Sequence, residues 1–291
     1  SGGAERMLLR LAQDMSARGH DVHIISWDRP EAKAFYPLSD AIHWHRLGFA
    51  KGGRDKVRRT FELSRLLKQI RCQVFVGFVM SADKTVYAAC LLANVPIVAA
   101  ERNSPEMYDL KFGVLVKAFY MGLFILAKRI VVQIEAYRKG YPRWLERRIE
   151  AIPNPVKPAT TLARPAARGE SGWTLLCVAR LEEQKNLEAL VRAFAMLAPE
   201  LIDWRLRIVG EGGLRGALTK LVSDLSLSGR VFLPGPVNDV EAEYAGANLF
   251  CLPSRWEGFP NALAEAMAHG LPAVGYAGCP GVNAIIHDGI D

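Results

Sequence analysis

Apolar residues repeat along this chain with helical and strand spacings in turn. Met7, Leu11 and Met15 follow each other at the four-residue spacing of one helix face, and Gly19 ends that helix. A strand is then predicted at residues 21–26, which hold Val22, Ile24 and Ile25. Helices that alternate with strands in this way predict an α/β fold with parallel sheets.

The same alternation continues through both halves of the chain. Further strands are predicted at residues 42–47, 73–78, 95–100, 130–132, 174–179, 205–209, 231–233, 249–252 and 273–276. Further helices are predicted at residues 83–93, 187–197, 239–245 and 260–270. Together these elements predict two Rossmann-like, doubly wound halves.

A proline-rich segment separates the two halves. It carries four prolines among small and polar residues, a composition that is poor in core formers and favours extended backbone. We therefore expect an N-terminal domain at residues 1–152, a linker at 153–172 and a C-terminal domain at 173–291. Two such domains imply a cleft between them, and ligands commonly bind at domain interfaces.

The most apolar stretch lies at residues 112–127. It is shorter than the ~20 residues that a helix needs to cross a bilayer, and it contains Lys117. The pattern predicts a buried helix, with docking at a membrane interface as the alternative.

The cysteines favour reduced thiols. The five cysteines are widely spaced without any Cys-x-x-Cys pair, which argues against a disulfide framework or a structural zinc site. The chain also opens without a signal-peptide pattern at Ser1. We expect a cytoplasmic protein, with peripheral contact at the inner face of the membrane as a further expectation.

The net charge of +7 is unevenly distributed. Residues 1–155 hold 25 Lys and Arg against 15 Asp and Glu, whereas residues 156–291 hold 12 against 15. A basic half suits nucleic acid, an anionic membrane or a phosphate-bearing substrate. Nucleic acid is not expected, because no RNA-recognition or helix-turn-helix signature is present. The basic helix between Arg58 and Arg71 is either a solvated helix or one that faces a membrane or a lipid phosphate.

The clearest candidate site follows the strand at residues 249–252. Glu257 and Glu265 flank a turn in which Pro260 marks the start of a helix that Gly270 ends. A helix N-terminus at the carboxyl end of a strand suits a phosphate or a polar sugar, and the two carboxylates can accept hydrogen bonds from ligand hydroxyls. The alternative is that both are ordinary helix-start and surface carboxylates.

Two further strand ends carry charged residues. Arg180 and Lys185 follow the strand at 174–179 and can clamp a diphosphate, or can form a surface cluster with Glu182 and Glu183. Arg102, with Asn103, follows the strand at 95–100, where ligands bind in parallel sheets, although a simple turn explains it equally well.

Three stretches of the chain resemble family-4 glycosyltransferases, which are retaining enzymes of the GT-B fold. These stretches are residues 254–272, residues 180–186 and the opening from Gly2 to Arg6. The resemblance implies that Glu257 contacts the donor sugar and Glu265 the ribose. It further implies donor-binding roles for a set of backbone groups and cations. These are Gly2, Gly3, Arg180, Lys185, Gly258, Phe259, Pro260 and Asn261. Glu257 and Arg102 are the catalytic candidates.

The function implied by this resemblance is sugar transfer from a nucleoside diphosphate, with UDP expected and an N-acetylhexosamine as one option. The acceptor is a hydroxyl of a lipid-linked sugar or a polysaccharide, since the chain looks most like members that act on polyprenyl-diphosphate-linked sugars. No cofactor and no metal are expected, because an Asp-x-Asp spacing is absent. By comparison with the family, the first strand and the C-terminal end are expected to be missing. A sugar-nucleotide epimerase and a non-catalytic nucleotide-binding fragment are the alternatives.

Overall fold

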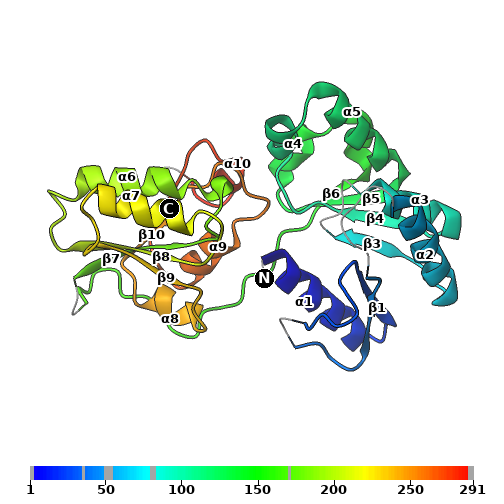
Figure 1. Cartoon of the computed structure of the whole chain (residues 1–291), viewed down its shortest axis with the longest axis horizontal. Helices are drawn as coiled ribbons and strands as arrows, with labels where there is room; N and C mark the ends of the chain where they lie inside the picture. The colour runs from blue at the N-terminus through cyan, green and yellow to red at the C-terminus, as the bar shows by residue number, and fades with distance from the viewer. Residues whose placement is uncertain (1–2, 35–36, 49–54, 79–82, 170–171, 288–291) are drawn as a thin grey trace. The chain divides into compact units, whose positions relative to one another are not determined.

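The computed structural model consists of two compact units, Ser1–Ile152 and Pro153–Asp291. The structure describes residues 3–34, 37–48, 55–78, 83–169 and 172–287. In each unit parallel strands alternate with helices, as Figure 1 shows. The predicted α/β fold with parallel sheets is thereby confirmed.

The first unit holds two parallel sheets. One consists of β1 (Val22–Ser26) and β2 (Ile42–Arg46). The other consists, in this order, of β3 (Phe75–Phe78), β4 (Ile97–Ala100), β5 (Ala127–Val132) and β6 (Ile149–Ala151). Parallel neighbours need a crossover connection, so helices or 3-10 turns lie between successive strands of this sheet. The sequence pattern did not predict β6, which is a short strand.

The helices of the first unit are α1 (Gly3–Ala17), α2 (Lys56–Gln69), α3 (Lys84–Ala93), α4 (Glu106–Lys111) and α5 (Val114–Leu123). The 3-10 turns are η1 (Phe124–Leu126), η2 (Glu135–Gly140) and η3 (Arg143–Arg148). Helix α3 begins where the Asp83 side chain accepts a hydrogen bond from the Thr85 amide, and it ends at Asn94 in the left-handed region. Helices α2 and α3 pack against each other, with Leu63 and Leu67 buried.

The predicted buried helix at residues 112–127 is wrong in its burial. The apolar stretch forms α5 followed by η1, but within α5 only Met121 is buried. Val114 and Leu115 expose 84% and 86% of their surface. Hydropathy shows that these side chains are apolar, but it cannot show whether another element of the fold packs against them. In the parts of the chain that the structure describes, no helix is long and apolar enough to span a membrane.

The second unit holds one parallel sheet with the strand order β11-β10-β7-β8-β9. Its strands are β7 (Trp173–Val178), β8 (Trp204–Val209), β9 (Val231–Gly235), β10 (Leu249–Leu252) and β11 (Ala273–Gly275). The chain runs outward from β7 to β9 on one side and then returns to start β10 on the other side of β7. The strand order therefore reverses between β7 and β10.

Helices cover both faces of this sheet. They are α6 (Leu187–Leu197), α7 (Arg215–Asp224), α8 (Val240–Ala245), α9 (Asn261–Ala268) and α10 (Pro280–Asn283), with the 3-10 turn η4 (Glu183–Lys185) before α6. Two apolar cores result, since successive strand residues point to opposite faces. Cys177 of β7 packs in the core with α6 and α7, whereas Leu176 packs in the core with α8 and α9.

The described part of the proline-rich segment, residues 153–169, packs along the second unit. The Ala163 amide donates to the His269 carbonyl at 2.7 Å, and the side-chain amide of Asn248 donates to the carbonyls of Pro165 and Ala167. These bonds give the backbone of a segment without regular structure the partners that it would otherwise find in water.

Candidate functional site

Two loops leave the sheet of the second unit side by side. Strands β7 and β10 are adjacent and parallel, so the residues after Val178 and after Leu252 start at the same edge. The strand order reverses at this point, and in open parallel sheets ligands bind in the crevice outside the carboxyl ends at such a reversal. The fold therefore places the two strongest sequence motifs at the expected ligand position of this unit.

Lys185 and Glu257 form a buried ion pair across these loops. The Lys185 Nζ lies 2.5 Å from Glu257 Oε1, and the two side chains are only 14% and 7% exposed. Charges so poorly solvated are stable only when paired and hydrogen-bonded. An ammonium carries three donors, so Lys185 can bind Glu257 and still donate to an incoming oxyanion. The sequence motifs predict separate roles for these two residues, and their contact appears only in the structure.

Gln184 joins the same two loops. The Gln184 side chain donates from Nε2 to the backbone carbonyl of Trp256 at 2.7 Å, and the backbone carbonyl of Gln184 accepts from the Arg255 backbone amide at 2.9 Å. These reciprocal bonds fix the turn that carries Lys185 against the loop that carries Glu257. Gln184 was not predicted as a site residue, because nothing in the local sequence pattern marks a glutamine that bridges two loops.

Arg180 follows β7 on the same loop as Lys185 but is bonded differently. Its guanidinium Nη1 donates to Glu182 Oε1 at 2.8 Å, and both side chains are about half exposed. For Arg180 the structure thus shows the surface pair that sequence analysis left open as an alternative. Exposed pairs of this kind are weak, so a phosphate can compete for the guanidinium.

The turn before α9 is well packed. Gly258 and Pro260 are buried, Phe259 is half-buried, and α9 begins at Asn261 with Pro260 in the capping position. The predicted helix start is therefore correct to within one residue. The Asn261 side chain accepts a hydrogen bond from Asn154 Nδ2 at 2.8 Å, which holds the first residue of the helix in place.

Glu265 lies one turn further along α9. Its Oε2 accepts a hydrogen bond from the Tyr244 hydroxyl at 3.1 Å. Tyr244 comes from α8 and is almost completely buried, with its ring 5.1 Å from that of His269. Such a rigid donor orients the carboxylate. Tyr244 is another site residue that the sequence pattern did not reveal.

Three thiols lie in the surroundings of the ion pair. Cys177 is fully buried beneath it, and burial raises the pKa of this thiol far above its ordinary value. Burial also raises the pKa of Cys251 to about 11 and raises that of Cys279. These cysteines are neutral at physiological pH; Cys177 and Cys251 lie in the core with α6 and α7, and Cys279 lies in the core with α8 and α9. All five cysteines are free thiols.

The first unit carries the remaining candidates. Gly2 lies outside the described residues, and Gly3 is the exposed first residue of α1. Arg102 follows β4, with its guanidinium 4.5 Å from the centroid of the Phe78 ring. Burial lowers the pKa of Arg102 to about 10, so it is still a cation at neutral pH.

A buried carboxylate precedes Arg102. Glu101 is 2% exposed, and its Oε2 accepts hydrogen bonds from the hydroxyls of Tyr108, at 2.7 Å, and Tyr141, at 3.5 Å. Burial, together with the Glu101 charge, raises the pKa of Tyr141 well above its ordinary value, so this phenol stays a donor. Glu101 therefore fixes the polar end of β4 next to Arg102, and sequence analysis did not single it out.

Comparison with known families decides the identity. Residues 1–160 match the family described as Glycosyltransferase Family 4, and residues 160–291 match Glycosyl transferases group 1. The chain belongs to glycosyltransferase family 4. The resemblance seen in the sequence motifs is confirmed, and with it the assignment as a glycosyltransferase.

Relatives of this family-4 glycosyltransferase agree over almost its whole length. An uncharacterized glycosyltransferase of Haemophilus influenzae is 27% identical, over 98% of this chain and 80% of its own. A GalNAc-alpha-(1->4)-GalNAc-alpha-(1->3)-diNAcBac-PP-undecaprenol alpha-1,4-N-acetyl-D-galactosaminyltransferase of Campylobacter jejuni is 24% identical, over 100% and 80%. The solved structure of Anabaena Alr3699/HepE with UDP and glucose is 16% identical over 99% and 81%, with a TM-score of 0.77, and this supports the GT-B fold.

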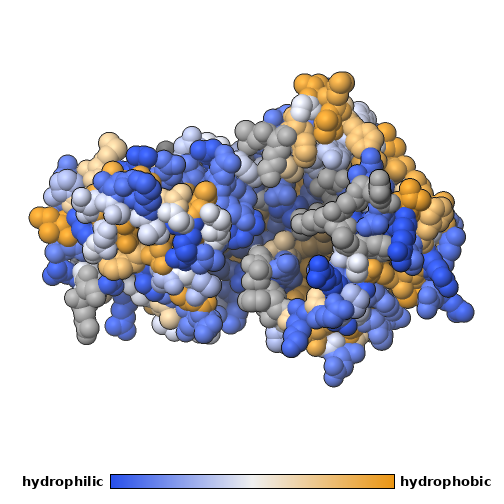
Figure 2. All heavy atoms as spheres, in the orientation of Figure 1, coloured by the Kyte–Doolittle hydropathy of each residue, from blue (hydrophilic) through white to orange (hydrophobic). Residues whose placement is uncertain are grey.

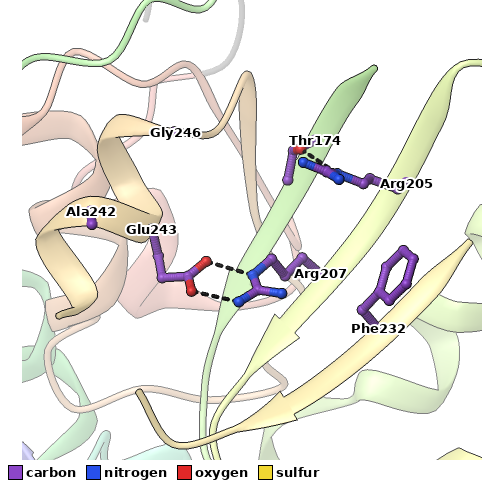
Figure 3. A pocket seen from close by; sticks show the side chains of 7 residues that line it. All are labelled: Thr174, Arg205, Arg207, Phe232, Ala242, Glu243 and Gly246. Carbon is purple, nitrogen blue, oxygen red and sulfur yellow. Dashed lines mark hydrogen bonds and ion pairs between the residues drawn. The ribbon is translucent and has the colours of Figure 1, made fainter. Parts of the chain in front are cut away.

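The family-4 chain also has an open pocket away from the predicted residues (Figure 3). Arg207 of β8 makes a bidentate ion pair with Glu243 of α8, with Nε 2.6 Å from Oε2 and Nη2 2.7 Å from Oε1. Arg205 Nε donates to Thr174 Oγ1 at 2.9 Å. Thr174 and Arg205 are the second residues of β7 and β8, so this pocket lies toward the amino ends of the strands. The Arg207–Glu243 pair ties α8 to the sheet and thereby supports Tyr244.

Proposed function

We propose that this family-4 glycosyltransferase transfers a sugar from a UDP-sugar to a hydroxyl of a lipid-linked or polysaccharide acceptor, with retention of the anomeric configuration. The observation that carries the proposal is the buried Lys185–Glu257 pair at the strand-order reversal of the second unit. At this position the cation can bind the diphosphate and the carboxylate can accept hydrogen bonds from the hydroxyls of the sugar.

The second unit is proposed to bind the donor. Lys185 and Arg180 would neutralise the diphosphate, with Lys185 as a point charge and Arg180 as a planar fork. Glu257 would hold the hydroxyls of the sugar. Glu265, oriented by Tyr244, would accept hydrogen bonds from the ribose hydroxyls. The backbone from Gly258 through Phe259 and Pro260 to Asn261 would line the sugar and the diphosphate.

The first unit is proposed to contribute Gly2, Gly3 and Arg102. The half-buried cation of Arg102 would stabilise negative charge on the departing diphosphate. Its neighbour Glu101 positions it only indirectly, through the fixed end of β4.

The reaction would proceed on the face of the sugar that carries the leaving group. The acceptor oxygen bonds to the anomeric carbon as the bond from that carbon to the phosphate oxygen breaks, and the acceptor proton passes to the departing phosphate. The products are the glycoside, with its configuration retained, and UDP. Lys185 and Arg180 would lower the barrier by stabilising the charge that grows on the leaving phosphate. Catalysis through fixed cations is consistent with our expectation that no metal takes part.

UDP as the nucleotide is supported by the fold, since Anabaena Alr3699/HepE has been solved with UDP and with UDP-glucose. An N-acetylhexosamine and a lipid-linked acceptor are supported by the Campylobacter jejuni relative, whose name includes both. The excess of positive charge in residues 1–155 suits a diphosphate-linked lipid and peripheral contact with an anionic membrane.

A donor screen tests the proposal. The chain would be incubated with radiolabelled UDP-glucose, UDP-galactose, UDP-GlcNAc and UDP-GalNAc and with an undecaprenyl-diphosphate sugar, and the anomeric configuration of the product would be read by NMR. Transfer with retention is expected. Free epimerised UDP-sugar would instead identify an epimerase, and tight UDP binding without turnover would identify a nucleotide-binding module. Either outcome overturns the proposal.

A further inference from the structure

The outer surface of α5 and η1 is an exposed apolar ridge. We define the α5 ridge as six residues that the fold leaves open to solvent, namely Val114, Leu115, Val116, Phe119, Ile125 and Leu126. Figure 2 shows hydrophobic side chains gathered where Figure 1 places α5. Scattered apolar residues are normal on a protein surface, but a contiguous group marks an interaction site.

The ridge stands on a rigid base. The rings of Phe112 and Tyr120 pack in a tilted arrangement with their centroids 5.1 Å apart, and the centroid of the Tyr108 ring lies 6.1 and 6.2 Å from theirs. The Tyr108 hydroxyl is in turn anchored to buried Glu101. The ridge is therefore a preformed surface, so binding of a partner does not carry the entropic cost of first ordering this helix.

Cations lie at the η1 end of the ridge. Arg148 donates from Nη1 to the carbonyls of Ile125, at 2.5 Å, and Ala127, at 2.9 Å, which brings its charge to the edge of η1. Lys128 is exposed directly after the ridge, and η3, which Arg148 ends, exposes Trp144 and Arg147. Residues 106–150 hold nine Lys and Arg against five Asp and Glu, a net charge of +4.

We infer that the α5 ridge is a docking surface for an anionic lipid bilayer. A helix lying flat in a bilayer interface buries its apolar face by roughly 5–10 Å, while basic residues and a tryptophan at the rim meet the headgroups. The charge decides between the candidate occupants. Two copies of this chain that met at the ridge would bring like charges together, whereas an anionic bilayer attracts both the apolar surface and its rim.

This inference deepens the lipid-linked acceptor of the proposed function, because a bilayer docked on the first unit brings acceptor lipids to the enzyme. Membrane docking through the ridge requires neither donor binding nor turnover, so it can be tested separately. A chain that binds vesicles and transfers no sugar would contradict the proposed function alone, and one that transfers sugar without binding vesicles would contradict the docking surface alone.

Vesicle flotation tests the surface. The complete chain would be mixed with vesicles of phosphatidylcholine alone, or of phosphatidylcholine with phosphatidylglycerol, at low and high salt. We expect binding to the anionic vesicles that weakens as salt rises. Leu115→Ser and Leu115→Asp should each reduce the partition coefficient, the second by ~tenfold or more, because a large exposed side chain no longer inserts. Both variants should keep the melting temperature, since Leu115 is 86% exposed.

The matched control is Met196→Asp, an equally exposed apolar residue of α6 in the second unit, at 81%. This variant carries the same change of charge and should float like the parent chain. Equal flotation of the Leu115 variants and the parent would overturn the inference, and so would an equal loss for Met196→Asp. Self-association of the parent that Leu115→Asp abolishes, without vesicle binding, would overturn it in favour of a second copy.

Discussion

Asn154 donates a hydrogen bond from its Nδ2 to Asn261 Oδ1 at 2.8 Å. Asn154 lies two residues beyond the boundary between the two units, and Asn261 is the first residue of α9 in the proposed donor site. The segment that connects the units is thereby tied to the helix that begins the site. A change in this segment should consequently be felt in donor binding.

Asn154→Ala should raise the KM for the donor about fivefold, which corresponds to the ~1 kcal/mol that an ordinary hydrogen bond contributes. Steady-state kinetics with the UDP-sugar would measure this. The matched control is Lys157→Ala, which removes an exposed contact of the same segment to Glu241 of α8 and leaves the bond to Asn261 intact. If both variants changed the KM equally, the effect would belong to the segment as a whole and not to the bond with Asn261.

Lys185→Met should strongly destabilise the second unit and abolish transfer. The substitution leaves the carboxylate of Glu257 buried without its cation, which typically costs about 3–5 kcal/mol. Thermal unfolding and transfer assays would measure the two effects. The double variant Lys185→Met with Glu257→Gln should recover much of the stability but none of the activity, because it removes the buried charge and both proposed ligand contacts. Recovered activity would contradict the assigned roles.

Arg180→Ala should separate binding from stability. Its ion pair with Glu182 is half exposed, so losing it should change the free energy of unfolding by less than about 1 kcal/mol. UDP affinity should nevertheless fall about tenfold, because the variant removes a charge-assisted contact to the diphosphate. Isothermal titration calorimetry with UDP and with uridine would check this, and an equal fall for uridine would show that Arg180 does not contact the phosphates.

Tyr244→Phe should weaken the recognition of the ribose. The variant keeps the buried ring and removes only the hydroxyl that donates to Glu265. We expect a loss of UDP affinity of about fivefold and a smaller loss for 2′-deoxy-UDP, since the carboxylate is less well oriented toward the ribose hydroxyls. A purely structural tyrosine would weaken both nucleotides equally. If Glu265→Ala left UDP affinity unchanged, the placement of Glu265 on the ribose would itself be wrong.

Chelation should leave transfer unaffected. The proposed site neutralises the leaving diphosphate with Lys185 and Arg180, so excess EDTA should change kcat by less than twofold. Added Mg²⁺ or Mn²⁺ should not restore activity to Lys185→Met. If EDTA abolished transfer and Mn²⁺ restored it, a bound metal ion, and not Lys185, would neutralise the leaving diphosphate.

The sequence predicted most of the fold because the secondary structure is locally encoded. The spacing of apolar residues identified strands and helices, and the structure shows that Asp83 and Asp239, where two of the predicted helices begin, cap α3 and α8 by accepting hydrogen bonds from them. The strand β6 was missed because its three residues include the charged Glu150 and directly follow the charged residues 146–148. The burial of α5 was predicted wrongly because burial depends on neighbours that are distant in the chain.

The site was predicted in its parts but not in its connections. Spacing and residue type singled out Lys185 and Glu257, yet their contact depends on β7 and β10 becoming neighbours across the strand-order reversal. Gln184, Tyr244 and Asn154 support the candidate residues through single hydrogen bonds from other loops and helices. No local pattern distinguishes such residues from ordinary polar ones, so only a structure reveals them.

The strand-order reversal also dictates when the site can form during synthesis. Leu175 of β7 pairs with Leu249 of β10, so one edge of β7 leaves the ribosome long before its partner has been made, while β8 can already pair on the other side. Until then that edge and the apolar face around Leu176 are exposed to other nascent chains. The bond between Lys185 and Glu257 can close only after β10 has joined the sheet, so it belongs to a late step of folding, followed by the pairing of β11 along the outer edge of β10.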